Sequence, residues 1–520
     1  MIRGVSAQDS SGVAAAAEHG PAEDGRAEPR PATQRRATDE GGVADKGRAA
    51  DAGSPHVVRL LMVASVALIT LAAFEALAVA TVMPVVVDDL GGLHLYAVAA
   101  GAPLAAQLIA TAASGAWVDA RGPRGSIVAG VLAFCVGLVV AGLAPAMEIL
   151  AVGRAVQGFG AGLLMVPLYV LVGSMVPADR QPRFFAAFAA AWVVPGLVGP
   201  AIAGTVADAV SWRWVFLAVP VLTLAAGAVL APLLRHVPRT RKARAPAARR
   251  ATRKVLLAAT GAGLAAAALQ VAGSDGGTQG LFLAVAGLAV LAVTVRLLLP
   301  AGTLRLGPGV PSAVACRGLL NAAFVSAETF LPLLLVREHG WTVREAGLVL
   351  TVSSLTWAGG SAVQGRVHDP RRRALLLWLG PLILVTGTLV AAAASLPGAP
   401  AWWVVVGWTI AGAGIGLVFP ALSVVVLQST PPAQHGAVSS SLQISDALGA
   451  ALGLAAAGAL FLAFVTQGAV GFLAGLLVSA ALAGGALAAG ARSSAATSPT
   501  SASPTSAPSP PTSASTSAPA

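Results

Sequence analysis

The sequence has little charge for its length. Asp, Glu, Lys and Arg together make up 11% of the 520 residues, while hydrophobic residues make up 56%. Soluble domains carry roughly 25% charged residues, and a water-facing globule has too little interior to bury this many apolar side chains. The composition therefore excludes an ordinary soluble protein and favours one embedded in a bilayer.

Several chemical signatures are missing as well. The only two cysteines, Cys135 and Cys316, lie within apolar runs, so we expect them to fill space and not to form a disulfide framework. No Gly-x-x-x-x-Gly-Lys-Ser/Thr segment occurs, which argues against ATP hydrolysis as an energy source within this chain. No Cys/His, Ser/His or metal-ligand constellation appears, so we expect no enzyme, no metal and no cofactor.

Long apolar runs dominate what is present. A bilayer core of about 30 Å needs about 20 apolar residues as a helix, and these runs are too long and too little alternating for barrel strands. We predict an all-α polytopic membrane protein with fourteen spans. The predicted spans are Val57–Val82, Leu95–Trp117, Ile127–Leu143, Ile149–Val172, Phe184–Val206, Trp214–Leu234, Val255–Ala272, Leu281–Leu299, Val314–Leu335, Ala346–Val363, Ala374–Ala394, Trp402–Leu427, Ala437–Phe464 and Val470–Ala489.

The positive charges gather after the even-numbered spans. Cytoplasmic loops carry an excess of Lys and Arg, so these connections and both termini are predicted to be cytoplasmic in the plasma membrane. Without spans seven and eight, the basic loops would still follow even-numbered spans, so charge does not distinguish twelve spans from fourteen. Length and hydropathy favour fourteen. The basic residues concerned are Arg121, Arg124, Arg180, Arg183, those within Arg235–Lys254, Arg296, Arg305, Arg366 and Arg371 to Arg373.

Three polar segments lie outside the spans. Residues 1–56 mix both charge signs with Ala, Gly and Pro, so we expect a disordered cytoplasmic tail without a cleavable signal peptide. Residues 492–520 are rich in Ser, Thr, Pro and Ala, and we expect disorder there too. The basic linker 235–254 is predicted to rest on anionic headgroups, and nucleic-acid binding is the weaker reading of its charge.

The chain repeats a polar turn. The segment Gly115–Arg124 has an echo in Gly365–Arg373, and each follows the second span of a six-span block. This spacing indicates an internal duplication. We predict an N-terminal six-helix bundle over 57–234 and a C-terminal one over 300–491, with two additional central helices over 255–299.

This turn resembles the signature loop of the major facilitator superfamily, although Ala120 and Pro123 stand where basic residues are usual. In that family the aspartate caps a helix of the other half and holds the cytoplasmic gate shut. The resemblance implies this role for Asp119 against the start of span thirteen near Gly436; the alternative is a solvated inner turn. The gate-motif residues are Gly115, Asp119, Gly122 and Arg124 in the first turn, and Gly365 and Asp369 in the second.

Two further segments resemble motifs of the same family. In span four, "RAVQGFGAG" carries Arg154, Gln157 and Gly158 on the positions of an Arg-x-x-Gln-Gly motif. In span five, "PGLVGPAIAG" is similar to a Gly-Pro-x-x-Gly-Gly motif associated with proton-driven exporters, although Ala203 replaces one glycine. Its candidate residues are Gly196, Gly199, Pro200 and Gly204. The stretch "WRWVF" at Trp212–Phe216, together with the fourteen-span count, resembles the multidrug:proton antiporter branch of the family.

Four ionisable residues stand out inside the predicted spans: Glu75, Arg154, Glu328 and Asp446. Each costs about 2.5–3.5 kcal/mol to insert at mid-bilayer, which makes it a functional candidate by default. We predict a role in proton coupling for all four, with Glu75 first and with Glu328 as its counterpart in the second block. The alternatives are inert hydrogen-bonded acids, a structural tie at Arg154 and a wet helix face at Asp446. Trp402, Trp403 and Trp408 are predicted to anchor the membrane interface.

The leading hypothesis is a proton-coupled secondary transporter that exports hydrophobic or amphiphilic compounds, including antibiotics, by alternating access. Its expected partners are a small hydrophobic substrate, protons and lipid, with no nucleic acid, and it is expected to work as a monomer. A lipid or metabolite carrier of the same fold remains the first alternative. A sensor or scaffold that does not transport is the second, and the tails, which carry no binding motif, argue against it.

Overall fold

The computed structural model describes residues 55–176, 181–234, 246–275, 277–367, 369–431 and 435–495. No strand occurs among these residues, and fourteen of their helices are long and apolar enough to cross a bilayer. The predicted all-α fold with fourteen spans is therefore confirmed. The helices are α2 (Pro55–Leu90), α3 (Tyr96–Arg121), α4 (Pro123–Gly142), α5 (Met147–Met175), α6 (Gln181–Ala209), α7 (Arg213–Leu233), α8 (Pro246–Asp275), α9 (Gly277–Leu298), α10 (Val310–His339), α11 (Val343–Gly365), α12 (Pro370–Ala392), α13 (Trp402–Gln428), α14 (His435–Ala463) and α15 (Ala469–Ala495).

Parts of the predicted polar segments lie outside the described residues. These are residues 1–54 and 496–520 of the two tails, Arg180, and residues 235–245 of the basic linker. The rest of that linker, residues 246–254, forms the first turns of α8. Hydropathy marks where a helix becomes apolar, whereas this helix begins nine residues earlier in polar sequence.

Local sequence determines where the helices end. Gly122 has φ of 81°, which ends α3, and Pro123 begins α4 at a position that needs no amide donor. Gly340, with φ of 67°, caps the end of α10. Two residues later Thr342 and Glu345 form a reciprocal capping box that starts α11.

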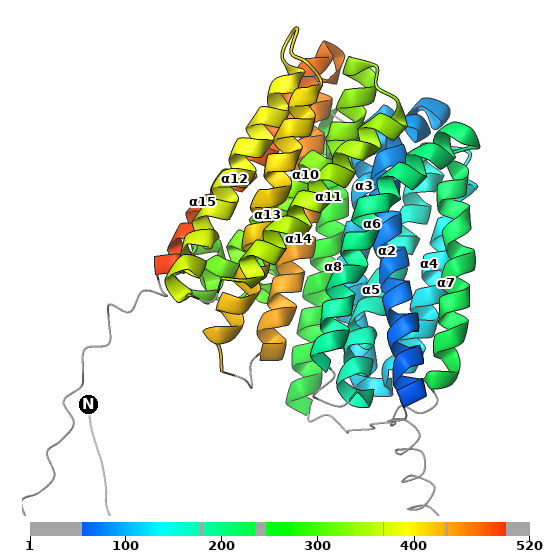
Figure 1. The fold of residues 1–520 in the computed structure, drawn as a ribbon, viewed down its shortest axis with the longest axis vertical. Helices are drawn as coiled ribbons and strands as arrows, with labels where there is room; N and C mark the ends of the chain where they lie inside the picture. Colours follow the sequence, from blue (N-terminus) through cyan, green and yellow to red (C-terminus); the bar gives the residue numbers. More distant parts are fainter. Residues whose placement is uncertain are drawn as a thin grey trace, which may run out of the picture. The chain divides into compact units, whose positions relative to one another are not determined.

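The helices form two groups of six that are built alike: α2 to α7 and α10 to α15. In each group the first helix packs on the fifth and sixth, the second on the fourth, and the third on the fourth and sixth. Figure 1 shows the second group to the left of the first. Between the groups, α3 packs on α14 and α6 packs on α11, so each group offers its second and fifth helices to the other.

Glycines hold equivalent helix pairs together in both groups. A Cβ atom on Gly137 of α4 would lie 2.6 Å from the carbonyl oxygen of Gly153 on α5. In the second group, a Cβ on Gly387 of α12 would lie 2.5 Å from the carbonyl oxygen of Gly407 on α13. Such small residues let backbones approach closely in lipid, where tight packing and not hydrophobic burial drives helix association.

The two additional helices form a hairpin at the seam between the groups. Helix α8 packs on α3 of the first group and on α14 of the second, whereas α9 packs principally on α8. The side chains of Leu281 and Phe282 on α9 are 66% and 72% exposed. Exposed apolar side chains of this size are expected on a helix that faces lipid.

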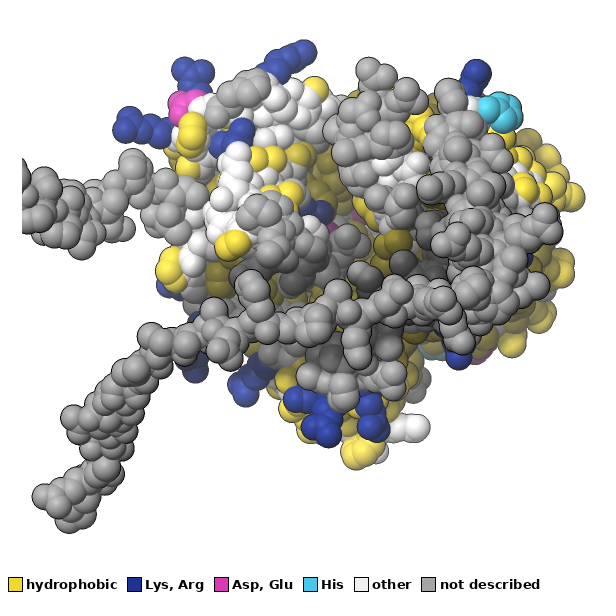
Figure 2. Space-filling view, turned by 90° about the horizontal axis from the view of Figure 1, so that it is seen from below, with side chains coloured by type: hydrophobic (Ala, Val, Ile, Leu, Met, Phe, Trp, Pro, Cys, Tyr) yellow, Lys and Arg dark blue, Asp and Glu magenta, His cyan; other side chains and the backbone are white. Residues whose placement is uncertain are grey.

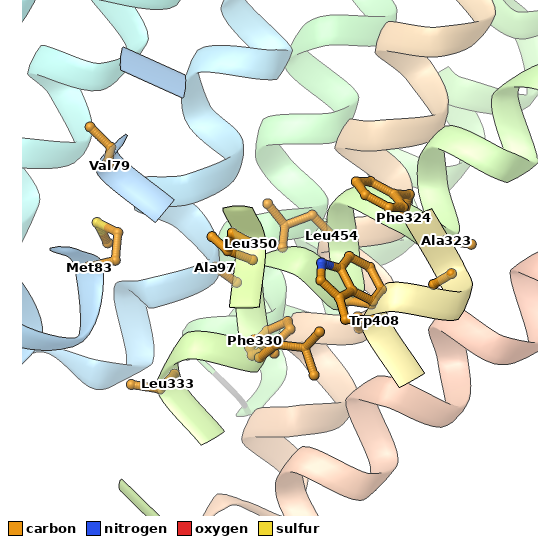
Figure 3. Close-up of a cluster of buried hydrophobic side chains, with 14 of the residues drawn as sticks. Val79, Met83, Ala97, Ala323, Phe324, Phe330, Leu333, Leu350, Trp408 and Leu454 are labelled. Atoms are coloured by element: carbon orange, nitrogen blue, oxygen red, sulfur yellow. The ribbon is translucent and has the colours of Figure 1, made fainter. Parts of the chain in front are cut away.

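The two groups pack directly on each other in a hydrophobic core at one end of the helices. Figure 3 shows Val79 and Met83 of α2 in one cluster with Phe330 of α10 and Leu350 of α11. Toward the end where α2 begins and α15 finishes, which we call the tail side, a second cluster contains first-group residues alone. A third cluster links Leu108 of α3 to Leu448 of α14 by way of Ala258 and Ala262 of α8. The groups are therefore joined directly on the opposite side and, toward the tail side, along the seam that α8 fills.

Candidate functional site

The first group buries a three-residue polar network between α2 and α5. Glu75 is 1% exposed, Arg154 is 5% exposed and Gln157 is 3% exposed. Nη1 of Arg154 donates to one carboxylate oxygen of Glu75, and Nε2 of Gln157 donates to the other. Nη1 of Arg154 also donates to Oε1 of Gln157 at 2.6 Å. Both carboxylate oxygens of the buried Glu75 therefore accept a hydrogen bond from a protein side chain.

One donor of this network is unused. Nε of Arg154 is buried and has no hydrogen-bond partner within the described part of the chain. A guanidinium group gains most from a carboxylate when it binds with two nitrogens, so Arg154 holds Glu75 by less than its full capacity. The contact between Arg154 and Glu75 is therefore made by one guanidinium nitrogen only.

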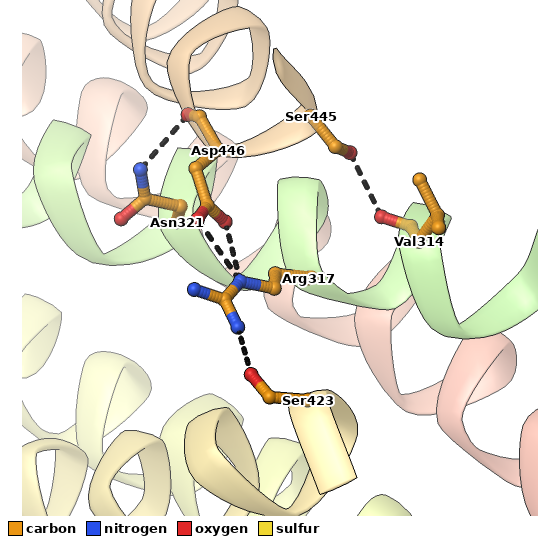
Figure 4. A network of polar contacts seen from close by, with 6 residues as sticks. All are labelled: Val314, Arg317, Asn321, Ser423, Ser445 and Asp446. Atoms are coloured by element: carbon orange, nitrogen blue, oxygen red, sulfur yellow. Dashed lines mark hydrogen bonds and ion pairs between the residues drawn. The ribbon is translucent and has the colours of Figure 1, made fainter. Parts of the chain in front are cut away.

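The second group carries a different charged network, shown in Figure 4. Nε of Arg317 on α10 donates to both carboxylate oxygens of Asp446 on α14, at 3.0 and 2.9 Å. Nη1 of Arg317 donates to Ser423, and Asn321 donates to the backbone oxygen of Asp446 at 2.9 Å. The guanidinium carbon of Arg317 lies 3.9 Å from the ring centroid of Phe419, a cation–π contact.

Glu328 does not mirror Glu75. It lies on α10 and is partly buried, and no described residue forms a hydrogen bond or an ion pair with its carboxylate. The predicted quasi-symmetric pair thus consists of one paired and one unpaired acid. The two groups share a packing plan but differ in their charges.

The prediction that Trp408 anchors the interface is wrong. Its ring is fully buried and stacks on Phe324 at a centroid distance of 4.6 Å. Phe324 meets Trp357, which in turn meets Phe419 beneath Arg317. Trp408 is therefore one end of an aromatic row inside the second group. Trp402 and Trp403, at the start of α13, stack on each other, and Trp402 is 54% exposed.

The tail side is hollowed between the groups. Figure 2 shows this face, and side chains of both charge signs are visible within the hollow. A substrate entering from the tail side would meet charged as well as apolar surface.

The two gate-motif turns differ in detail. Asp369 is the N-cap of α12, where its side chain accepts from the amide of Arg371 at 3.0 Å, and Arg372 lies 3.8 Å from it. Asp119 lies in the last turn of α3 and interacts with other residues, and Arg124 is exposed in the first turn of α4. The side chains at the predicted partner site near Gly436 lie outside the described ones. Cβ atoms on Gly115 or Gly365 would meet nothing within 4 Å.

The candidate antiporter motif lies on α6 where the two groups touch. A Cβ on Gly196 would contact Ser354 of α11, and one on Gly204 would lie 2.7 Å from the Cα atom of Arg344. The carbonyl oxygen of Pro200 faces Gly347 across the same seam, while Gly199 faces α2 of its own group. Pro200 also removes one backbone donor within α6. Gly196, Pro200 and Gly204 therefore let α6 and α11 pack closely where the two groups meet.

Polar contacts close the side opposite the tails. Arg337 of α10 donates to Asp88 of α2 at 2.6 Å, across the two groups. The hydroxyl of Tyr96 on α3 donates to the carbonyl oxygen of Thr329 on α10 at 2.6 Å, and this bond is buried. The neighbouring Asp89 instead accepts from Arg213, within its own group.

Sequence reasoning missed Arg317. It lies inside the predicted ninth span, three residues after Val314, and the cost of a buried charge was the signal that should have selected it. The pairing of Arg154 with Gln157 was visible only as a motif. No sequence pattern placed Arg317 beside Asp446, because they are 129 residues apart.

Comparison with known proteins agrees with this architecture. The profile of the Major Facilitator Superfamily matches residues 63–382 and 313–517. A probable multidrug-efflux transporter of Mycobacterium tuberculosis is 28% identical over 422 residues, covering 76% of this chain and 89% of the relative. The multidrug transporter protein MdtP of Bacillus subtilis is 30% identical over 144 residues, 28% of this chain and 27% of that protein.

Solved structures share the fold. A bacterial homolog of the human lysosomal transporter Spinster, in an inward-facing and occupied conformation, has a TM-score of 0.61 at 16% identity, covering 85% of this chain and 97% of that one. Two matching six-helix groups around a hollow with buried charges define a polytopic membrane transporter of small molecules. The chain belongs to the Major Facilitator Superfamily, as its motifs predicted, and it is a transporter and not an enzyme.

Proposed function

We propose that this transporter exports hydrophobic or amphiphilic compounds from the cytoplasm in exchange for protons. The observation that carries the proposal is the buried Glu75, held by Arg154 and Gln157 inside the first group. The relatives from Mycobacterium tuberculosis and Bacillus subtilis, a probable multidrug-efflux transporter and a multidrug transporter protein, support the choice of substrate class.

The proton step follows from the chemistry of the pair. A buried carboxylate is tolerable while Arg154 balances its charge, but an isolated one is costly and takes up a proton once the cation moves away. Rotation of α5 against α2 therefore exchanges an ion pair for a neutral acid. In this scheme Glu75 is the proton carrier, Arg154 and Gln157 release and recapture it, and Glu328 and Asp446 are secondary acids in the other group.

The orientation of the transporter in the membrane is inferred from the charge bias of the loops. Basic connections on the tail side favour a cytoplasmic position for that side, and in this proposal the hollow is an inward-facing substrate entrance. The close seam at Gly196, Pro200 and Gly204 and the gate motifs at Asp119 and Asp369 then act in turn as the groups rock. We assign the protein to the plasma membrane as a monomer with both termini cytoplasmic.

One proton per cycle is enough for useful export. Moving one charge through 100 mV yields about 2.3 kcal/mol, and one pH unit adds about 1.4 kcal/mol. Since a factor of ten in concentration costs about 1.4 kcal/mol, one proton sustains a gradient of several hundredfold for an uncharged substrate.

The test is uptake of ethidium into inside-out membrane vesicles under an imposed pH gradient. Wild-type vesicles are expected to accumulate ethidium only while the gradient lasts, and Glu75→Gln vesicles are expected to equilibrate it without accumulation. Glu328→Gln is the comparison variant: because Glu328 is a secondary acid in this scheme, the variant is expected to keep most of the uphill transport. Equal membrane insertion is checked by quantitative blotting.

Uphill ethidium accumulation by Glu75→Gln at the wild-type rate would refute Glu75 as the carrier. Accumulation by the wild-type protein that is indifferent to the gradient would refute proton coupling altogether. If radiolabelled phospholipid moves between leaflets in these vesicles and ethidium does not, the alternative of a lipid carrier replaces the proposal.

A further inference from the structure

An apolar cavity of about 850 Å³ lies between the α8–α9 hairpin and helices α10, α14 and α15. Of its lining residues, only Thr303 and Ser445 carry a polar side-chain atom. Both hydroxyls are already used: Thr303 donates to the carbonyl oxygen of Pro300 at 2.7 Å, and Ser445 donates to that of Val314 at 2.8 Å. The wall offers hydrocarbon contact and no free donor.

The cavity has the length of a lipid chain. Its lining on α14 runs from Ser445 to Ala459, a rise of about 21 Å at 1.5 Å per residue. One leaflet of a bilayer core is about 15 Å thick, half of about 30 Å. Because α9 packs principally on α8, it leaves the space toward α10 and α14 unfilled. An occupant of this depth and chemistry is a hydrocarbon chain, since water has no partners there.

The tail-side mouth of the cavity is basic. Leu304 and Leu306 line the cavity on either side of Arg305, which is exposed. Arg296, in the last turn of α9, and Arg492, near the end of α15, are exposed as well. Nη1 of Arg492 donates to the carbonyl oxygen of Arg305 at 3.3 Å, which brings two of these three segments together.

No acid balances these arginines in their own segments. The chain from residue 290 to 327 and from 469 to 495 contains neither Asp nor Glu. Basic pockets at the end of membrane helices attract anionic headgroups. An apolar slot whose lining extends about 21 Å along α14 and that opens at such a pocket matches an acidic phospholipid, with an acyl chain in the slot and the headgroup at the arginines.

We propose that an acidic phospholipid of the surrounding bilayer binds here, with an acyl chain between α9 and α14 and its phosphate at Arg296, Arg305 and Arg492. The lipid fills the space that α9 leaves open and joins the hairpin to the second group. This site is separate from the hollow between the groups, and it stands whether or not transport is coupled to protons.

The acyl-chain part is tested with a phosphatidylglycerol probe that carries a diazirine on one acyl chain. The full-length protein is reconstituted at neutral pH in phosphatidylcholine vesicles containing the probe, irradiated, and digested for mass spectrometry. Cross-links are expected on cavity-lining residues of α9 and α14. Ala292→Trp, which fills the cavity, is expected to lower them at least fivefold, whereas Ala289→Trp, on the same helix but outside the lining, is expected to leave them unchanged.

The headgroup part is tested by charge removal. Arg296→Gln combined with Arg305→Gln is expected to weaken probe labelling about 30-fold, because each basic residue near the surface contributes about 1 kcal/mol. The matched control, Arg371→Gln with Arg372→Gln, removes two exposed arginines from another tail-side turn and is expected to have no effect. Unlabelled phosphatidylglycerol is expected to compete and phosphatidylcholine is not.

Three outcomes would overturn the proposal. Cross-links spread evenly over all lipid-facing helices would show that no site exists, and equal losses in Ala292→Trp and Ala289→Trp would show that the cavity is not the site. Competition by free oleate that exceeds that of phosphatidylglycerol would assign the slot to a free amphiphile instead of a bilayer lipid. Monodispersity on size exclusion and an unchanged thermal midpoint establish that each variant is folded.

Discussion

Replacement of Asp88 by Asn should favour opening of the transporter on the side opposite its tails. Asp88 is bound by Arg337 of the second group at 2.6 Å, so the pair exists only while the groups are together on that side. Removing the carboxylate charge takes away an interaction of the closed arrangement and none of the open one. The equilibrium between the two arrangements must then shift toward the open one.

The size of the shift can be worked from exposure. The side chains of Arg337 and Asp88 are 32% and 54% exposed, so their pair stabilises the closed arrangement by about 0.2–1 kcal/mol. With RT of about 0.59 kcal/mol, the ratio of open to closed protein rises about 1.4- to 5-fold. Tyr96→Phe removes the buried hydrogen bond to Thr329 and should destabilise the closed arrangement by about 0.5–1.5 kcal/mol more.

The populations are read by pulsed electron–electron spin resonance. Nitroxides at Val210→Cys and Leu396→Cys label exposed turns of the two groups on the side opposite the tails. The two native cysteines are buried and do not compete for the label. The long-distance population is expected to grow in Asp88→Asn and to grow further when Tyr96→Phe is added.

The adjacent acid provides the control. Asp89 accepts from Arg213 at 2.8 Å and from Trp212 at 3.0 Å, both within the first group, so Asp89→Asn should leave the distance distribution unchanged. Exchanging the charges of the cross-group pair, Asp88→Arg with Arg337→Asp, should restore the wild-type ratio. Equal shifts in Asp88→Asn and Asp89→Asn would refute the reasoning, as would no shift when Asp88→Asn and Tyr96→Phe are combined.

Two further predictions concern packing and charge. Gly204→Ala places a methyl group 2.7 Å from the Cα atom of Arg344, so it should lower stability by about 1–3 kcal/mol and slow transport; Gly199→Ala meets its neighbour at 3.4 Å and should leave the thermal midpoint nearly unchanged. Arg317→Gln leaves the carboxylate of Asp446 unpaired and should cost about 3–5 kcal/mol in unfolding experiments. Adding Asp446→Asn should recover most of that loss, and a double variant as unstable as the single one would contradict the pairing.

Much of the fold was predictable because lipid imposes it. Every backbone amide in the bilayer needs a partner within its own helix, so length and hydropathy alone predict the spans. The helix limits were less predictable, as α8 shows: its first nine residues are polar but continue the helix of the apolar segment. Charge patterns predict sides, but they contain no information on how two helices rotate against each other.

The candidate site was predictable residue by residue but not as a set of contacts. Glu75 and Arg154 stood out because charge is costly among apolar neighbours, whereas their meeting depends on the facing of α2 and α5. Trp408 was misplaced because three tryptophans near the start of an apolar run look like an interface. Trp408 lies about two turns into α13, on the face of the helix that packs against Phe324, so its side chain is buried.

The position of α8 has a mechanical consequence. This helix packs on α3 through Gly263, whose Cβ would lie 2.8 Å from the carbonyl oxygen of Ala105, and reaches α14 through Gln270, which donates to Ala451 at 3.4 Å. When the groups rock, α8 can travel with only one of them and must slide along the other. Helix α8 also meets α14 closely at Gly273, whose Cβ would lie 3.1 Å from the Cα atom of Ala459. A hairpin attached to both groups therefore limits the angle through which the transporter can open.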